Sequence, residues 1–432
     1  MKLNKFMPIS LLALALAGLT GCGSKGTKEG ELLIWTFSDE MKEIVTDYYS
    51  KHYEGVVNVD VKSSVTQVTY DLSNAQRARK GIPDIVCLEA AVIAKYTDKN
   101  INDSVFLSLD DIEGTSNMYD YTKSVATSLD GHLIGLSWQA TPGAFFYKED
   151  VAAQVGITSV EQMEEKISTW QGFLDLAADC KTHNIHVTSA ITEPIKVFLG
   201  SRSKGWVENN TLQMEDVMFG PTTGTKANCF DVMRELQQNQ YTNGTVERAS
   251  GWNNDIASTS CLGNFCSSWG LKFDLMKYAG TTAGHWKMCK APENYFKGGT
   301  WLAVPRGATN IDLAKQFIKY VTTDQDFLTE RCQKTGDFMN SRAVMQTLKQ
   351  NYQCEFLGGQ NHLEKLYTIA EQINGNLISP YDAIIDSSFQ SVAGYYAQLA
   401  NGTPAENEEE REKQKDNFVV GVKGSYPQII VE

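Results

Sequence analysis

The sequence predicts an α/β protein in which strands pair in parallel. Residues 31–37, 56–61 and 81–89 are rich in β-branched and aromatic residues, as strands are, and a helical pattern that follows Ser38 separates the first two. Alternating strands and helices are typical of a parallel α/β sheet. The 432 residues of the chain are enough for one large core or two medium ones.

The middle of the chain is expected to be richer in helices. A capping box at Ser159 begins one helix, and residues 230–238 form another. Short strands are predicted over 187–191 and 264–270. The chain then returns to the first part of the fold through a glycine-led strand over 298–305.

The domain organisation depends on residues 131–150. This stretch is apolar, aromatic and extended, with Thr141, Pro142 and Gly143 at a bend between two strand-like runs. Such a segment is either a hairpin within one domain or a strand that leaves one sheet and enters another. Both interpretations stay open when this stretch is considered alone.

The N-terminus has the pattern of an export signal. Lys2 and Lys5 precede an apolar run that is too short to span a bilayer. Small residues stand directly before Cys22, which resembles the bacterial lipobox and implies cleavage before that cysteine and lipidation of its thiol. We therefore predict a signal peptide over 1–21 and a lipidated, flexible tether over 22–30, which would anchor the body at the outer face of the cell membrane.

The composition excludes several classes of function. The formal net charge is −13 and no Lys/Arg cluster stands out, so nucleic acid is not an expected partner. No Walker-type or GxGxxG loop follows a strand, so no cofactor is expected. The pairs His183 with His186 and His285 with Cys289 do not match a zinc spacing well, so no metal site is expected either.

Nine cysteines are many for an exported chain. With Cys22 lipidated, eight remain, and an even number permits disulfides. Buried thiols are the alternative. We favour thiols because Cys87 and Cys180 lie inside apolar patterns.

An ordered set of motifs extends over nearly the whole chain. It consists of the run Pro83 to Val86, the segment 131–150, the pair Ser268-Trp269, and the strand 298–305 with the helix after it. Together with the lipobox, this set resembles the solute-binding lipoproteins of sugar ABC transporters, extracellular family 1, which include the maltodextrin-binding proteins.

The resemblance implies a two-lobed, periplasmic-binding-protein-like α/β fold of type II, in which three crossings join the lobes beside a ligand cleft. It implies crossings at 138–142, near Gly299, and between 345 and 380, and it favours a crossing over a hairpin within 131–150. The expected lobes are 31–139 plus 302–345 and 140–301 plus 346–432.

The function that the resemblance implies is binding rather than catalysis. The protein would act as a monomer that captures a mono- or oligosaccharide and delivers it to ABC permease subunits in the membrane. A receptor for a peptide or a metal chelate is the alternative. An anchored glycoside hydrolase is a weaker one, because no pair of carboxylates stands out by spacing and no Gly-x-Ser-x-Gly elbow is present.

A sugar cleft combines aromatic rings, which stack on C–H faces, with polar groups that bond hydroxyls. Trp269 stands where the resembled family carries an aromatic platform. Glu193 with Pro194 matches a Glu-Pro motif at a cleft loop, although Ile195 replaces the usual aromatic residue. Glu89 stands at the end of the strand after Pro83, where the family often has an acid.

The remaining candidate ligand-binding residues stand at predicted strand ends, helix starts and crossings. They are Phe37, Glu40, Trp138, Gly299, Trp301, Asp386 and Phe389. For each tryptophan the alternative is core packing, and for Glu40 and Glu89 it is a helix cap or a surface position.

Overall fold

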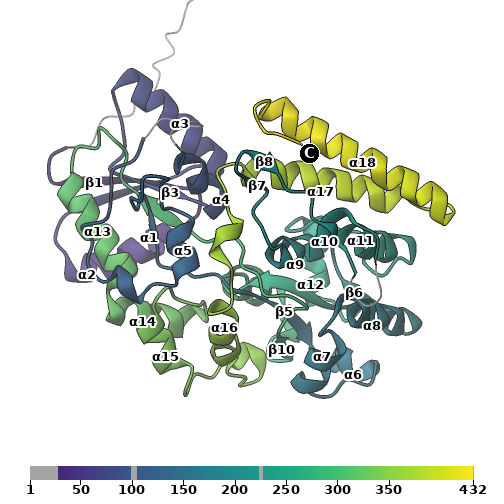
Figure 1. The fold of residues 1–432 in the computed structure, drawn as a ribbon. Coiled ribbons are helices and arrows are strands. Elements are labelled where there is room, and N and C mark those ends of the chain that lie inside the picture. Colours follow the sequence, from purple (N-terminus) through teal and green to yellow (C-terminus); the bar gives the residue numbers. More distant parts are fainter. Residues whose placement is uncertain (1–27, 99–104, 223–226, 432) are drawn as a thin grey trace, which may run out of the picture.

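The computed structural model describes residues 28–98, 105–222 and 227–431, and it contains two sheets that helices cover (Figure 1). The first sheet has the order β2-β1-β3-β11-β4, and the second has the order β10-β5-β9-β6. Cys22 and the predicted signal peptide lie outside the described residues.

The first sheet confirms the parallel pairing predicted for the N-terminal strands. Strand β1 pairs in parallel with both β2 and β3, whereas β11 runs antiparallel to β3 and β4. Its strands are β1 (Glu31–Thr36), β2 (Val56–Val61), β3 (Ile85–Leu88), β4 (Leu136–Ser137) and β11 (Trp301–Ala303). The helices around it are α1 (Glu40–Ile44), α2 (Ser50–His52), α3 (Val65–Ala78), α4 (Ala90–Ile93), α5 (Asp120–Ser124), α13 (Ile311–Thr323), α14 (Gln325–Thr335) and α15 (Arg342–Leu348).

The second sheet is mostly antiparallel. Strand β5 pairs with β9 and β10 in antiparallel fashion, and β6 joins β9 in parallel. Its strands are β5 (Gly143–Lys148), β6 (His186–Thr188), β9 (Cys261–Ser267) and β10 (Trp286–Cys289), and a hairpin of β7 (Val207–Glu208) and β8 (Thr211–Leu212) lies apart. The helices around it are α6 (Glu149–Gln154), α7 (Val160–Lys166), α8 (Trp170–Thr182), α9 (Glu193–Ser201), α10 (Asp216–Phe219), α11 (Cys229–Gln238), α12 (Ser250–Ala257) and α16 (His362–Ala370).

The last two helices, α17 (Asp382–Leu399) and α18 (Pro404–Ser425), lie side by side over this second part of the fold (Figure 1, yellow). Helix α17 packs against α11 and also touches α4 of the first lobe. Just before it, the turn η7 (Gly375–Leu377) packs against α5. The C-terminal segment therefore contacts both lobes.

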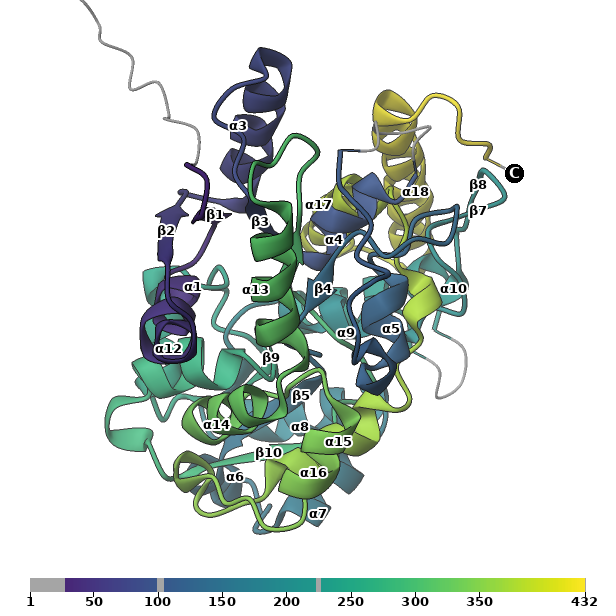
Figure 2. The same ribbon diagram turned by 90° about the vertical axis from the view of Figure 1, so that its left-hand side faces the viewer.

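The central strands of each sheet are buried on both faces. In β5, Phe145 and Tyr147 pack into the core under α8 and α17, whereas Ala144 and Phe146 face a core that continues toward the first sheet. The side chains alternate because successive residues of a strand point to opposite faces of the sheet. The view in Figure 2 shows α13 alongside the first sheet, where Phe317 and Ile318 fill the core.

The chain passes between the two sheets in the places where crossings were expected. Residues 138–142 lead from β4 to β5, and residues 290–300 lead from β10 back to β11. After α15, the chain reaches α16, which packs against β5 and β10. Residues 131–150 are therefore a crossing and not a hairpin. Trp301 was expected to be the last residue of the segment 140–301 in the C-terminal lobe. It is instead the first residue of β11 in the first sheet.

All eight cysteines among the described residues are free and buried, which agrees with the thiol interpretation. Burial raises the pKa of the Cys87 thiol to about 12, so this group stays protonated and inert. Within the described ranges, no helix is long and apolar enough to cross a membrane.

Candidate functional site

Three neighbouring hollows form a cleft between the two lobes. The largest, here the platform hollow, has a volume of ≈ 380 Å³ and lies between Phe37 and Glu40 of the first lobe and Trp269 of the second. The middle hollow (≈ 160 Å³) lies behind Trp269. The distal hollow (≈ 100 Å³) reaches α17. Glu89 lines all three, so the hollows form one continuous cleft.

Trp269 is held at the centre of this cleft. It follows the end of β9, is half-buried, and donates a hydrogen bond of 2.9 Å from Nε1 to the carbonyl oxygen of Lys297 in the second crossing. Gly298 and Gly299 next to it have φ of +71° and +91°. A Cβ on Gly298 would lie 3.0 Å from the indole nitrogen, so the glycine permits the close approach of crossing and ring.

Arg248 covers one face of the Trp269 ring. Its guanidinium carbon lies 4.4 Å from the ring centroid, which is a cation–π distance. Asp274 fixes it there, since both carboxylate oxygens accept bonds from Nη2 at 3.0 and 3.1 Å. Burial raises the pKa of Asp274, and the charge of Arg248 opposes that rise. A ligand ring that stacks on this face of Trp269 would have to displace the Arg248 guanidinium.

Two charged side chains project into the cleft without a protein partner. The Glu89 carboxylate caps no helix and makes no hydrogen bond or ion pair with any described residue. The Lys297 ammonium lines the middle and distal hollows and makes no hydrogen bond or ion pair within the described part of the chain, although its charge acts to lower the pKa of both Glu247 and Asp386. One acceptor and one donor are therefore available to a ligand.

Lys196 and Glu247 form the polar wall of the middle hollow. Their Nζ and Oε2 atoms lie 2.7 Å apart, and Lys196 also donates to the carbonyl of Phe265 at 3.2 Å. For Glu247, burial raises the pKa, and the nearby Lys196 charge and hydrogen bond outweigh that effect, so the pKa is lowered. Both groups are charged at neutral pH.

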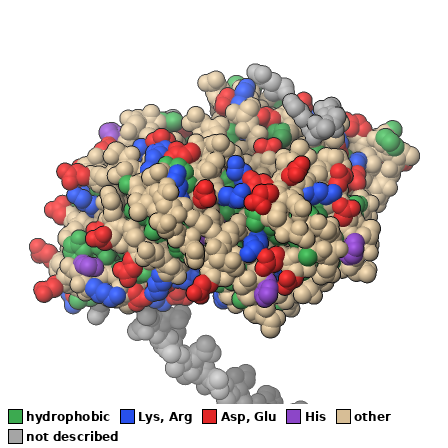
Figure 3. Space-filling view, turned by 90° about the horizontal axis from the view of Figure 1, so that it is seen from below, with side chains coloured by type: hydrophobic (Ala, Val, Ile, Leu, Met, Phe, Trp, Pro, Cys, Tyr) green, Lys and Arg blue, Asp and Glu red, His purple; other side chains and the backbone are tan. Residues whose placement is uncertain are grey.

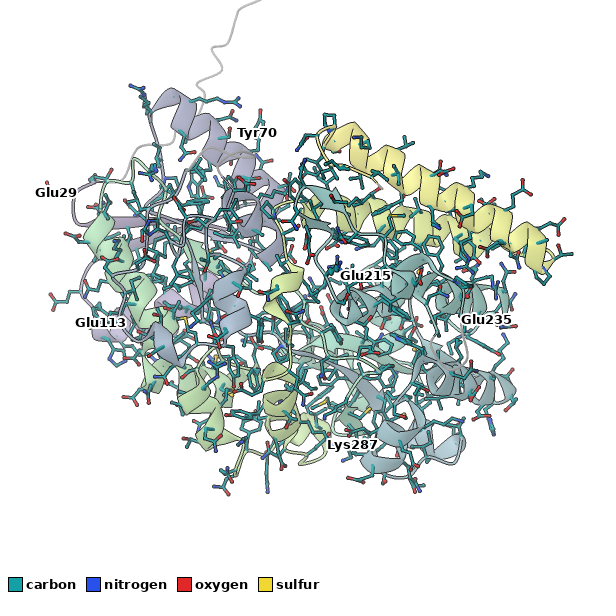
Figure 4. The ribbon with its side chains drawn as sticks, in the orientation of Figure 1. Glu29, Tyr70, Glu113, Glu215, Glu235 and Lys287 are labelled. Atoms are coloured by element: carbon teal, nitrogen blue, oxygen red, sulfur yellow. The ribbon has the colours of Figure 1, made fainter. Side chains whose placement is uncertain are left out.

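Glu113 and Glu235, which Figure 4 labels, lie at the outer edges of the two lobes. Residues 43–353, more than half of the chain, match the family model for bacterial extracellular solute-binding proteins. The chain belongs to this family. The match confirms the resemblance drawn from the sequence motifs.

Solved structures of solute-binding proteins share the fold over almost the whole chain. A family 1 extracellular solute-binding protein has a TM-score of 0.74 at 16% identity, covering 91% of this chain and 99% of that chain. The galacto-N-biose/lacto-N-biose I-binding protein of Bifidobacterium longum has a TM-score of 0.70 at 16% identity, covering 94% and 100%.

A binding protein of B. animalis subsp. lactis, solved with β-1,6-galactobiose, has a TM-score of 0.68 at 19% identity, covering 93% of this chain and 99% of that chain. A search of curated proteins found no match. The structural matches confirm the two-lobed fold of this solute-binding protein.

The structure corrects three of the predicted aromatic ligand contacts. Trp138 is 1% exposed and lies in the core beside the crossings, and Trp301 is fully buried and donates from Nε1 to the Thr122 carbonyl at 3.0 Å. Phe389 is buried against Trp206 on the far side of the second sheet. These aromatic side chains complete cores, because a strand end or helix face directs them inward and not toward the cleft.

Glu193 is also a structural residue. Its carboxylate is fully buried and accepts four hydrogen bonds, from the Ala190 and Phe265 amides, the Trp252 indole and the Asn264 amide group. Burial raises the pKa of Glu193 to about 7, and the four N–H donors favour the ionised form. The solute-binding protein uses this carboxylate to fix β9 and α12 behind the cleft.

Glu40 lines the platform hollow but is not free to bind a ligand. Its Oε1 lies 2.7 Å from Nη2 of Arg331, which is fully buried. Burial raises the pKa of Glu40, and the Arg331 charge counteracts the rise only in part. The carboxylate was expected to contact the ligand, and it anchors α14 to α1 instead.

The other predicted residues lie where a ligand could reach them. Phe37 and Gly299 line the platform hollow, and Asp386 lines the distal hollow. The sequence analysis missed Arg202, Arg248, Asp274 and Lys297. Lys297 directly precedes the two glycines of a motif that was recognised, so its position could have been noticed. Arg248 and Asp274 carry no local signal, because only the fold brings them to Trp269.

An ion pair joins the two lobes near the platform hollow. Lys272, in the π-helical turn η4 (Leu271–Met276) after Trp269, lies 2.8 Å from Oε2 of Glu43 on α1. Burial alone would raise the pKa of Glu43, but hydrogen bonds from Lys272 and Lys334 outweigh it and hold the pKa at about 2. The Glu43 carboxylate therefore stays ionised throughout the pH range in which a glutamate usually titrates.

We expect Lys272→Met to weaken ligand binding by about two- to fivefold, the effect of a partly exposed ion pair. A ligand that touches both lobes favours their closed arrangement, and this pair adds to the same arrangement. Titration calorimetry at low and high salt measures the effect, which should shrink as salt increases. Lys166→Met is the matched control, because Lys166 pairs with Asp179 inside one lobe. Equal losses in both variants would contradict the assignment.

Proposed function

We propose that this solute-binding protein captures a carbohydrate in the cleft between its lobes. The observation that carries the proposal is Trp269, an aromatic ring held at the centre of the cleft between unpaired polar groups. Glu89 offers an acceptor for hydroxyl groups, and Lys297 offers a donor. A stacking surface with convergent donors and acceptors is the combination that a sugar requires.

The charges of the cleft support a neutral ligand. Basic and acidic side chains line the hollows in similar numbers: Lys196, Arg202, Arg248, Lys277 and Lys297 against Glu40, Glu89, Glu247, Asp274, Asp382 and Asp386. Lys196 is paired with Glu247, and Arg248 is paired with Asp274. Acidic and basic side chains are likewise interspersed over the face in Figure 3. A site with no excess of either sign suits hydroxyl groups better than an anion or a cation.

The sugar would then pass to the membrane subunits of an ABC importer. In this proposal, the protein acts as a monomer, the lipid anchor on Cys22 holds it at the cell surface, and the lobes are joined by residues 138–142, by residues 290–300 and by the chain after residue 345. Relatives of similar fold, solved with β-1,6-galactobiose and with lacto-N-biose, support a carbohydrate ligand. Catalysis has no part in the proposal, since the matched family consists of binding proteins.

A thermal-shift screen tests the proposed function. The protein from Gly23 onward is heated with mono- and oligosaccharides, amino acids, peptides and metal ions. We expect one sugar class alone to raise the unfolding midpoint, because a ligand that binds only the folded state stabilises it by mass action. A midpoint that responds to peptides or metal ions and to no sugar would overturn the proposal and leave the fold standing.

A further inference from the structure

The distal hollow differs from the rest of the cleft because α17 lines it and does not line the other two hollows. Residues 89–91 come from the first lobe, and Lys196 to Arg202 come from α9 of the second lobe. Asp382 and Asp386 come from α17. No tryptophan lines this hollow, and its charged groups lie among apolar side chains such as Leu199, Phe296 and Ile378.

Arg202 is the most constrained charge of the distal hollow. It is 6% exposed, its guanidinium lies 4.4 Å from the centroid of the Trp206 ring, and its Nε and Nη2 donate to the carbonyls of Leu199 and Leu377. Its Nη1 donates to no acceptor in the described part of the chain. A buried N–H group without an acceptor is costly, so a bound group that accepts a hydrogen bond would remove the cost.

Asp382 and Asp386 present two carboxylates on one face of α17, because residues four apart in a helix are neighbours. Trp206 donates to Asp386 at 2.7 Å, and Ser379 donates to Asp382. Burial raises the pKa of Asp386, and the charge of Arg202, which lines the same hollow, opposes that rise. Among the described residues, however, Arg202 forms no ion pair with either aspartate.

A hydroxyl group has the chemistry to bind Arg202 and one of the two aspartates. It can accept a hydrogen bond from a guanidinium and donate one to a carboxylate at the same time. The hollow is the smallest of the three (≈ 100 Å³), and Glu89 and Lys297 line both it and the middle hollow. A ligand that extends from Trp269 past Glu89 would bring its next hydroxyl groups to this place.

We propose that the distal hollow binds the hydroxyl-bearing edge of a second sugar ring, so that the ligand is an oligosaccharide whose first ring lies at Trp269. This inference rests on the proposed function. Arg202 and Asp386 then select for chain length, and Trp269 supplies the contact that any sugar of the class makes.

Titration calorimetry with sugars of matched kind and different length tests the inference. The probes are galactose with β-1,6-galactobiose, and glucose with maltose and maltotriose. We expect at least one of the longer sugars to bind about tenfold or more tightly than its own monosaccharide. Asp386→Asn should weaken binding of the longer sugar about fivefold and leave the monosaccharide unchanged, because asparagine still accepts the Trp206 bond but loses the charge-assisted contact.

The outcomes separate this inference from the proposed function. If a monosaccharide binds as tightly as its longer relatives, the second ring has no subsite, although the protein still binds sugar. Equal weakening of both lengths by Asp386→Asn would also overturn the inference. Binding of no sugar at all removes the proposed function itself. Asp416→Asn, at an exposed position on α18, is the matched control, and the comparison on the wild-type protein stands even if a variant fails to fold.

Discussion

Trp269→Ala should weaken sugar binding by about tenfold or more, which corresponds to a loss of roughly 1.4 kcal/mol or more of stacking and burial. The indole is the central aromatic surface of the platform hollow, and its hydrogen bond to the Lys297 carbonyl keeps it in place before the ligand arrives. Truncation removes both the stacking surface and this preorganisation. Titration of the purified variant with the sugar found in the thermal screen measures the effect.

Trp269→Phe is the control for this prediction. A phenyl ring keeps a stacking face and loses the indole N–H, so its affinity should lie between those of the wild type and the alanine variant. Arg248→Ala removes the guanidinium that covers one face of the Trp269 ring. It therefore frees this stacking face and keeps the hydrogen bond that holds the indole in place. An unchanged dissociation constant for Trp269→Ala would refute the platform role.

Arg331→Met should lower the free energy of unfolding by about 3–5 kcal/mol, the cost of leaving a buried charge without its partner. Arg331 is fully buried, its Nη2 lies 2.7 Å from Glu40, and its Nη1 lies 3.1 Å from Glu43. Methionine fills a similar volume and leaves the Glu40 carboxylate buried and unpaired. Denaturant unfolding measures the loss.

The loss in Arg331→Met should depend on pH. Burial already raises the pKa of Glu40, and removal of the arginine removes what opposes that rise. A carboxyl group whose pKa is higher in the folded than in the unfolded protein stabilises the fold at low pH. This stabilisation is lost as the pH rises through the pKa of the folded state. The variant should therefore be less destabilised at acidic pH than at alkaline pH.

Two further variants check the cause of the loss in Arg331→Met. The double variant Arg331→Met with Glu40→Gln should regain part of the stability, because both charges are gone. Lys334→Met is the matched control: Lys334 lies on the same helix and pairs with Asp47 at 2.8 Å, but its side chain is 46% exposed. Its cost should not exceed about 1 kcal/mol. A cost equal to that of Arg331→Met would contradict the argument from burial.

The local sequence determined which segments of this protein form strands and helices. Strand β2 begins and ends where the β-branched run does, and β1 ends one residue before the predicted limit. The final helix begins at Pro404 with Thr403 and Glu406 in a complete capping box. These features depend on residues a few positions apart, so their chemistry can be predicted without the fold. The bend at Pro142 and Gly143 likewise marked the first crossing.

The residue types of the site were also partly readable from the sequence. Trp269, Glu89, Phe37 and Gly299 line the cleft because each stands at the end of a strand or within a crossing, where such folds place ligands. A recognised motif thus located the cleft. The motif could not show whether a carboxylate in the cleft is free or is paired with another side chain.

Only the tertiary structure decided which of these side chains are available to a ligand. Glu40 and Glu89 occupy similar positions after a strand, but Arg331, 291 residues away from Glu40 in sequence, neutralises the first and leaves the second free. Trp138 and Trp301 differ from Trp269 only in the direction of the side chain, which strand register and packing set. Burial and pairing arise from contacts between distant segments, and so they belong to the fold and not to any local pattern.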